Sequence, residues 1–280
     1  MHTYSPDGVR IAYDVTGEGE PTLVFVHGWC CDRSYWQPQV QQLSQQYRVV
    51  AIDLAGHGES GLNRAQWSMQ AFAADVVAVL EQFDVANAVL IGHSMGGPIV
   101  LEAGIRAPDR VLGVIGVEAF FDDWCLIDPE PFRANFAETT MAFVKSMFLS
   151  ESDRDLIERV ASDMANGPSA VGIGALEGIR KWAADDFDRA FREIKAAVRM
   201  IQRERTPDLL TQVRSHAPSL TSFDIAVMPG VSHFAMMEQP MTFNRLLQGF
   251  VDGIAAAPMR MRSTHNPREE VTSTFRRRRR

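Results

Sequence analysis

Short apolar runs alternate with amphipathic stretches along the first 117 residues. Strand-like runs rich in β-branched residues occupy 9–15, 22–26, 48–54, 88–91 and 111–117. Apolar residues at helical spacing occupy 36–46, 69–83 and 98–107. Strands that are apolar on both faces and alternate with helices predict βαβ units and a mostly parallel sheet.

The pattern changes after Glu118. Residues 119–185 contain no convincing strand, and the spacing predicts helices over 132–148, 152–164 and 171–182. Strand character returns at 197–201 and 224–228, with helices expected over 207–215 and 242–254. We therefore predict an α/β core in two parts, 1–118 and 186–257, around a helical insertion, 119–185. Residues 258–280 have the composition of a disordered tail.

Charge is distributed unevenly over the 280 residues, of which 46% are hydrophobic. The formal net charge is −7, but residues 258–280 hold eight Arg and two Glu, so residues 1–257 carry −13. An acidic body disfavours nucleic acid as the main partner. The run Arg276–Arg280 is expected to be a solvated tail.

Cysteine usage and hydropathy exclude several classes of protein. Cys30, Cys31 and Cys125 form no disulfide framework, and the chain has no C-x-x-C, H-x-H or H-E-x-x-H spacing. We expect no metal and no cofactor. The N-terminus lacks the pattern of a signal peptide, and no apolar run approaches the length of a membrane span. These absences predict a cytoplasmic protein that is not bound to membranes, and they leave its oligomeric state unknown.

Gly92-His93-Ser94-Met95-Gly96 stands between a predicted strand and a predicted helix. This is the G-x-S-x-G pattern of a sharp strand-to-helix turn that exposes a nucleophilic hydroxyl. Side chains two residues before and after the serine would clash, so both positions favour glycine. The following helix N-terminus offers free N–H groups to developing negative charge.

Four motifs together resemble the α/β-hydrolases that carry a helical cap. They are Val24–Trp29, Asp53–Ser60, Gly92–Gly97 and Gly230–Phe234, in the family's order, and the resemblance covers about residues 5–255. It implies a mostly parallel eight-stranded sheet flanked by helices, with residues 119–185 as the inserted cap.

The resemblance also implies the roles of several residues. Ser94 is the nucleophile, and His233, after the last strand, is its general base. The oxyanion hole is formed by the backbone N–H groups of Met95 and Trp29, with the Trp29 indole beside the acyl pocket. The alternative for Trp29 is a simple core residue. His27 and His57 are expected to be structural.

The catalytic acid departs from the family's usual pattern. The loop that usually carries it, 200–208, has no glycine, and Asp208 falls within a predicted helix. Some relatives place the acid after the strand that follows the nucleophile helix, where this chain has Glu118. A carboxylate there needs a cation or an imidazole N–H as partner. We predict Glu118 as the acid. Glu204 and Asp208 are alternatives, and so is a merely structural ion pair of Glu118.

Large apolar residues crowd the predicted insertion, and we expect Phe120, Phe121 and Trp124 to roof the pocket, with Phe234 after the base. An apolar roof favours an apolar acyl or alcohol group. The leading hypothesis is a serine esterase acting on small to medium uncharged carboxylic esters. A lactonase, a C–C bond hydrolase or a perhydrolase would share the same triad. A ligand receptor with little turnover, or a nucleic-acid or membrane binder acting through Arg276–Arg280, would belong to other classes.

Overall fold

The computed structural model describes residues 1–120, 123–204, 215, 220 and 222–256. Its strands are β1 (His2–Tyr4), β2 (Arg10–Thr16), β3 (Thr22–Val26), β4 (Val49–Ile52), β5 (Ala88–His93), β6 (Val111–Val117), β7 (Ala197–Arg203) and β8 (Phe223–Met228). They form one eight-stranded sheet in the order β1-β2-β4-β3-β5-β6-β7-β8. The β1–β2 and β2–β4 pairs are antiparallel, and the remaining pairs are parallel. The predicted fold class is therefore confirmed.

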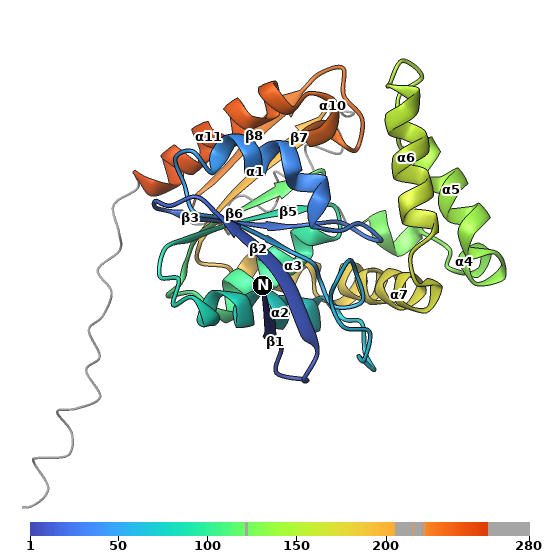
Figure 1. Ribbon diagram of the computed structural model, residues 1–280, viewed down its shortest axis with the longest axis horizontal. Helices are drawn as coiled ribbons and strands as arrows, with labels where there is room; N and C mark the ends of the chain where they lie inside the picture. The colour runs from blue at the N-terminus through green and yellow to red at the C-terminus, as the bar shows by residue number, and fades with distance from the viewer. Residues whose placement is uncertain (121–122, 205–214, 216–219, 221, 257–280) are drawn as a thin grey trace, which may run out of the picture.

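Helices cover both faces of this sheet (Figure 1). The helices of the core are η1 (Arg33–Trp36), α1 (Gln37–Leu43), α2 (Met69–Gln82), α3 (Gly96–Arg106), α10 (Ala235–Glu238) and α11 (Pro240–Ala255). In Figure 1, α1 and α11 lie above the sheet and α2 and α3 below it. Every residue of β3 and β5 is buried. This explains why these strands are apolar on both faces.

A helical insertion separates β6 from β7 in the chain. It consists of η2 (Asp123–Leu126), α4 (Glu130–Ala134), α5 (Phe136–Ser146), α6 (Arg154–Ala165), α7 (Ser169–Asp185) and α8 (Phe187–Glu193). Figure 1 shows α4, α5 and α6 set to one side of the sheet, with α7 nearer to it. Below, "helical insertion" means η2 to α8.

Some boundaries differ from the predicted ones for local reasons. The single helix expected over 132–148 is two helices, because Asn135 leaves the helical conformation and its side chain accepts the Glu138 N–H to begin α5. β1, α8 and α10 were not predicted, since each is short and lacks a clear hydrophobic period. Apart from Ser215, the helix expected over 207–215 lies outside the described residues, as do the predicted acid alternative Asp208 and the tail 258–280.

The described helices include none with both the length and the apolar character needed to cross a membrane.

Candidate active site

Ser94 occupies a strained turn at the end of β5. Its φ is +53°, in the left-handed region that a residue with a side chain rarely adopts. A Cβ on Gly92 would lie 2.1 Å from the Gly96 carbonyl oxygen, and one on Gly96 would lie 2.6 Å from that of Val26. The Ser94 N–H donates to the Val117 carbonyl at 2.9 Å. Both glycines are therefore required by close backbone approach, as the elbow pattern predicted.

The loop after β3 passes directly against this turn. A Cβ on Gly28 would lie 3.2 Å from the Ser94 Cβ. His27 holds the loop with both ring nitrogens: Nδ1 donates to the Gly28 carbonyl at 2.8 Å, and Nε2 accepts the Leu54 N–H at 3.0 Å. Within the described chain, neither the Met95 nor the Trp29 backbone N–H donates a hydrogen bond to another residue. Two donors thus remain available beside the serine.

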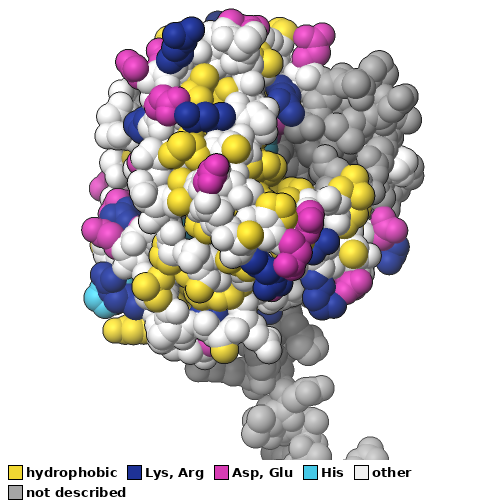
Figure 2. All heavy atoms as spheres, turned by 90° about the vertical axis from the view of Figure 1, so that its right-hand side faces the viewer, with side chains coloured by type: hydrophobic (Ala, Val, Ile, Leu, Met, Phe, Trp, Pro, Cys, Tyr) yellow, Lys and Arg dark blue, Asp and Glu magenta, His cyan; other side chains and the backbone are white. Residues whose placement is uncertain are grey.

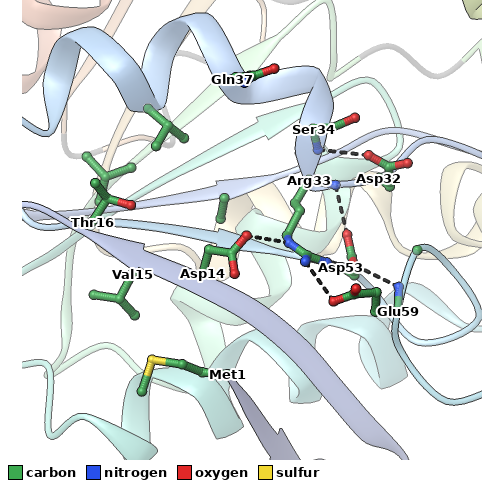
Figure 3. Close-up of a pocket in the computed structure, with 14 residues that line it drawn as sticks. Met1, Asp14, Val15, Thr16, Asp32, Arg33, Ser34, Gln37, Asp53 and Glu59 are labelled. Carbon is green, nitrogen blue, oxygen red and sulfur yellow. Dashed lines mark hydrogen bonds and ion pairs between the residues drawn. The ribbon is translucent and has the colours of Figure 1, made fainter.

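A charged network holds the far end of the same loop (Figure 3). The three guanidinium nitrogens of Arg33 contact Asp14, Asp53 and Glu59, and the Arg33 backbone N–H donates to Asp53 at 2.8 Å. These residues line a groove of about 660 Å³ that shares no lining residue with the cavity over Ser94. Arg33 thus ties the segment that follows Trp29 to β2 and to the loop after β4.

Glu118 ends β6 in a second strained turn, with φ at +49°. Its side chain is fully buried, and its Oε2 lies 3.5 Å from His233 Nδ1. Its Oε1 accepts the Arg203 backbone N–H. Glu204, the alternative acid that the structure describes, is exposed. Of the carboxylates considered, Glu118 is the one that the described structure brings to the imidazole.

His93, inside the elbow, holds the loop that carries His233. Its Nε2 donates to the His233 carbonyl at 2.9 Å, and the two imidazole rings are 4.8 Å apart. Burial lowers the pKa of His93 to about 3, so this ring stays neutral at the near-neutral pH at which most enzymes work. The G-x-S-x-G pattern does not predict this role of His93, because it does not say where the His93 side chain points.

The helical insertion contacts the His233 loop at three points. The His233 N–H donates to the Met147 carbonyl at 3.4 Å. The rings of Phe148 and Phe234 stack with centroids 5.0 Å apart. Glu238 links the two segments, because its carboxylate accepts both the Ser152 hydroxyl and the Ser232 N–H. The position of His233 therefore depends on the insertion as well as on the sheet.

A small enclosed cavity lies over Ser94. Its lining residues are Trp29, Cys31, His93, Ser94, Trp124, Met147, Met164, His233 and Phe234. Its volume of about 10 Å³ holds about one water molecule. Trp124 and Phe234 line it as expected, whereas Cys31, Met147 and Met164 were not foreseen. A larger substrate requires the groups that line the cavity to rearrange.

Phe120 corrects one expectation. It is fully buried and lies outside the cavity, because its ring packs against Gly116, where a Cβ would be 2.4 Å away, and edge-on against Phe191 at 5.5 Å. Its φ of +68° lies in the left-handed region, and its side chain is not among those that line the cavity over Ser94. Phe121 lies outside the described residues.

The Trp29 indole joins the loop after β3 to the helical insertion. Its Nε1–H donates to the Gly172 carbonyl of α7 at 2.7 Å. Its ring packs edge-on against two phenylalanines, with ring centroids 5.5 Å from that of Phe132 and 5.9 Å from that of Phe136. Trp29 is thus both a cavity wall and a structural contact of the insertion.

In the parts of the chain that are described, no group of three or more His, Cys, Asp or Glu side chains could hold a metal ion. All three cysteines are free, and burial raises the pKa of the Cys30 and Cys31 thiols.

The sequence profile of the alpha/beta hydrolase fold matches residues 21–220. The chain belongs to this family. Curated relatives of this α/β hydrolase differ in activity. It is 26% identical, over 85% of its length, to the dihydrolipoyllysine-residue acetyltransferase component of the acetoin cleaving system of Pseudomonas putida. It spans 65% of that relative and 29% of the matching component of Cupriavidus necator.

Two further relatives match over nearly their whole length. The α/β hydrolase is 25% identical to the pimeloyl-[acyl-carrier protein] methyl ester esterase of Yersinia enterocolitica, over 86% of this chain and 97% of the relative. A solved structure described as "Est816 as an N-Acyl homoserine lactone degrading enzyme" is 27% identical, with a TM-score of 0.76 over 89% of this chain and all of the other. The relatives of this chain therefore include one protein named as an esterase and one described as degrading a lactone.

Proposed function

We propose that this α/β hydrolase cleaves small to medium uncharged carboxylic esters through an acyl-enzyme on Ser94. The observation that carries the proposal is the convergence of three groups. Ser94 and His233 line one cavity, and the buried Glu118 carboxylate lies 3.5 Å from His233 Nδ1. These are the three groups that an activated serine needs: a nucleophile, a base and a carboxylate beside the base.

In the proposed reaction, His233 takes the Ser94 proton as Oγ attacks the ester carbonyl carbon. The negative charge on the former carbonyl oxygen is stabilised by the available N–H groups of Met95 and Trp29. The C–O bond to the alcohol then breaks, and His233 returns the proton to the leaving oxygen. Water repeats the sequence on the acyl-enzyme and releases the acid. Glu118 orients the imidazole and stabilises its protonated form.

The walls of the cavity support an uncharged substrate. Opposite Ser94 stand Trp124, Met147 and Met164, all from the insertion or the segment beside it. None of these side chains can offset the desolvation of a charge. Figure 2 looks onto this side of the molecule, where hydrophobic side chains run between charged ones.

A lactonase is the second candidate, because the Est816 relative is described as degrading an N-acyl homoserine lactone. A lactone is a cyclic ester, so the same triad would open it. The leaving oxygen would then remain attached to the acyl group. Only the shape of the opened cavity distinguishes the two substrates.

The test is hydrolysis of matched p-nitrophenyl esters, lactones and vinylogous diketones by the wild type and by Ser94→Ala. We expect ester turnover that falls at least about 10³-fold in Ser94→Ala. Ser150→Ala, at an exposed serine of the insertion, is the control and should keep full activity. Absence of wild-type turnover on every ester would refute the proposal. Retained ligand binding by Ser94→Ala, without turnover in the wild type, would favour a receptor.

A truncation after Ala257 distinguishes an esterase from a binder that acts through the basic tail. An esterase should keep its activity without residues 258–280. A nucleic-acid or membrane-surface binder that depends on Arg276–Arg280 should lose its binding.

A further inference from the structure

The end of β7 holds the Glu118 segment through two side chains. Arg203 contacts the carboxylate with its backbone N–H on Oε1 and with Nε at 3.3 Å from Oε2. Gln202, fully buried, donates to the Ala119 carbonyl at 3.0 Å. The Glu118 N–H in turn donates to the Ile201 carbonyl at 3.0 Å. Three successive residues of β7 thus fix the position of one carboxylate.

The two carboxylate oxygens have different partners. Oε1 takes the Arg203 backbone N–H, whereas Oε2 lies between the Arg203 guanidinium and His233 Nδ1. A carboxylate that is bound at one oxygen can rotate only by breaking that bond. The backbone contact therefore turns Oε2 toward the imidazole, and the guanidinium holds it there.

We propose that Arg203 is a positioning residue that acts on the base through Glu118. This inference rests on the proposed serine-hydrolase function. Arg203 holds the buried carboxylate in its orientation, and its positive charge offsets part of the negative charge that His233 experiences. A smaller net negative charge beside an imidazole disfavours its protonated form. With Arg203 in place, the base stays neutral and active to a lower pH.

Other groups adjoin His233 in the described structure, and they come from several elements. His93 of β5 is neutral because its burial lowers its pKa to about 3. Glu238 of α10 binds the N–H of Ser232, one residue before the base. The adjoining insertion residue Met147 is uncharged and presents its carbonyl. Arg203 adds a cation in contact with Glu118.

A merely structural ion pair between β6 and β7 would also be lost with the guanidinium, so activity alone cannot test the proposal. The pH dependence of the reaction rate can test it, because that dependence responds to charge near His233 and not to the strength of packing. The variants are Arg203→Met, which removes the charge, and Arg203→Lys, which keeps it. The control is Arg199→Met on the same strand, whose guanidinium contacts the Val198 carbonyl and the Ser222 hydroxyl instead.

The readout is the rate at which a fluorophosphonate labels Ser94 between pH 5 and 9, measured beside kcat/KM on a p-nitrophenyl ester. Labelling forms an Oγ–P bond, releases fluoride and transfers the serine proton to the base, so it needs no knowledge of the substrate. We expect Arg203→Met to be labelled about tenfold more slowly at neutral pH. The acidic limb of its pH–rate profile, where the rate falls as the pH drops, should move about one pH unit toward higher pH. Arg203→Lys and Arg199→Met should keep the limb at its wild-type position.

An unmoved acidic limb in Arg203→Met would overturn the proposal, and so would an equal shift in Arg203→Lys. If Arg203→Met does not fold, Arg203→Gln, which also removes the charge but keeps a polar side chain, takes its place and should move the limb by the same amount. The effect of Arg203→Met should also largely vanish in a Glu118→Gln background, because Arg203 acts through that carboxylate. Labelling of the wild type without ester turnover would contradict the proposed function and leave the Arg203 result standing.

Discussion

The two sides of the cavity over Ser94 are built differently. On the sheet side, Ser94 and Glu118 sit at strand ends in left-handed conformations, each with its N–H bonded to a neighbouring strand. On the insertion side, the wall consists of Trp124, Met147 and Met164, which contribute apolar contacts. Backbone hydrogen bonds fix atoms within narrow limits, whereas methionine side chains repack easily. We therefore expect substitutions on the sheet side to change mainly the reaction rate, and substitutions in the apolar wall of the insertion to change mainly the substrate preference.

Removing the charge on the sheet side should have the largest effect. Glu118→Gln keeps the shape but loses the anion that faces His233, so kcat/KM on esters should fall about 10³-fold. Glu204→Gln, at an exposed carboxylate on the adjacent strand end, should stay near wild type. Steady-state kinetics of both variants decide the matter. The reverse ranking would move the acid from β6 to the end of β7.

Trp29 connects the two sides, and its indole should matter for both. Trp29→Phe removes the bond to the Gly172 carbonyl, so we expect kcat/KM to fall about tenfold and stability by about 1–2 kcal/mol. Trp182→Phe is the matched control, because its buried indole donates to Glu102 outside the cavity. Urea unfolding and ester kinetics of both variants are the measurements. An equal loss of rate in Trp182→Phe would show that the insertion acts only through overall stability.

The sheet side also contains three buried histidines, and they predict how stability depends on pH. Burial lowers the pKa of His27 to about 4 and of His57 and His93 to about 3. Below pH 6.5 the unfolded chain binds protons that the folded chain does not. The free energy of unfolding should therefore fall as pH drops from 6.5 toward 4, by about 1.4 kcal/mol per pH unit for each histidine.

His57→Asn tests this dependence, because its amide can replace the Nδ1 donor to the Ala55 carbonyl. Urea unfolding at several pH values between 6.5 and 5 should give a mean slope smaller by about 1 kcal/mol per pH unit. His2→Asn, at an exposed histidine, should leave the slope unchanged. The same slope in His57→Asn as in the wild type would mean that His57 is not kept neutral by burial.

The smallest effect is expected on the insertion side. Met164→Ala enlarges the cavity, so the ratio of kcat/KM for longer to shorter acyl chains should rise about threefold to tenfold. Leu156→Ala on the same helix, away from the cavity, should keep the wild-type ratio. A series of p-nitrophenyl esters measures the ratio. A change in rate without a change in chain-length preference would mean that Met164 supports the position of His233 and does not set which substrate fits.

Residues that follow from a local pattern could be predicted, and residues that depend on packing could not. Ser94 and its glycines follow from steric limits within five residues, and the α/β fold follows from the alternation of buried strands with helices. The environment of Glu118 could be predicted only in part. The need of a buried carboxylate for a partner was clear, but Arg203 as that partner required the register of β6 against β7.

By itself, the sequence determined the parallel sheet, the strained nucleophile turn and the helical segment that interrupts the sheet, because hydrophobic period and glycine sterics act over short distances. Only the tertiary structure decided that Phe120 packs in the core, that Met164 lines the same cavity as Ser94 and that His93 donates to the His233 carbonyl. Each of these depends on which side chains from distant segments meet. Such meetings are set by the close packing of the whole molecule, which no local pattern encodes.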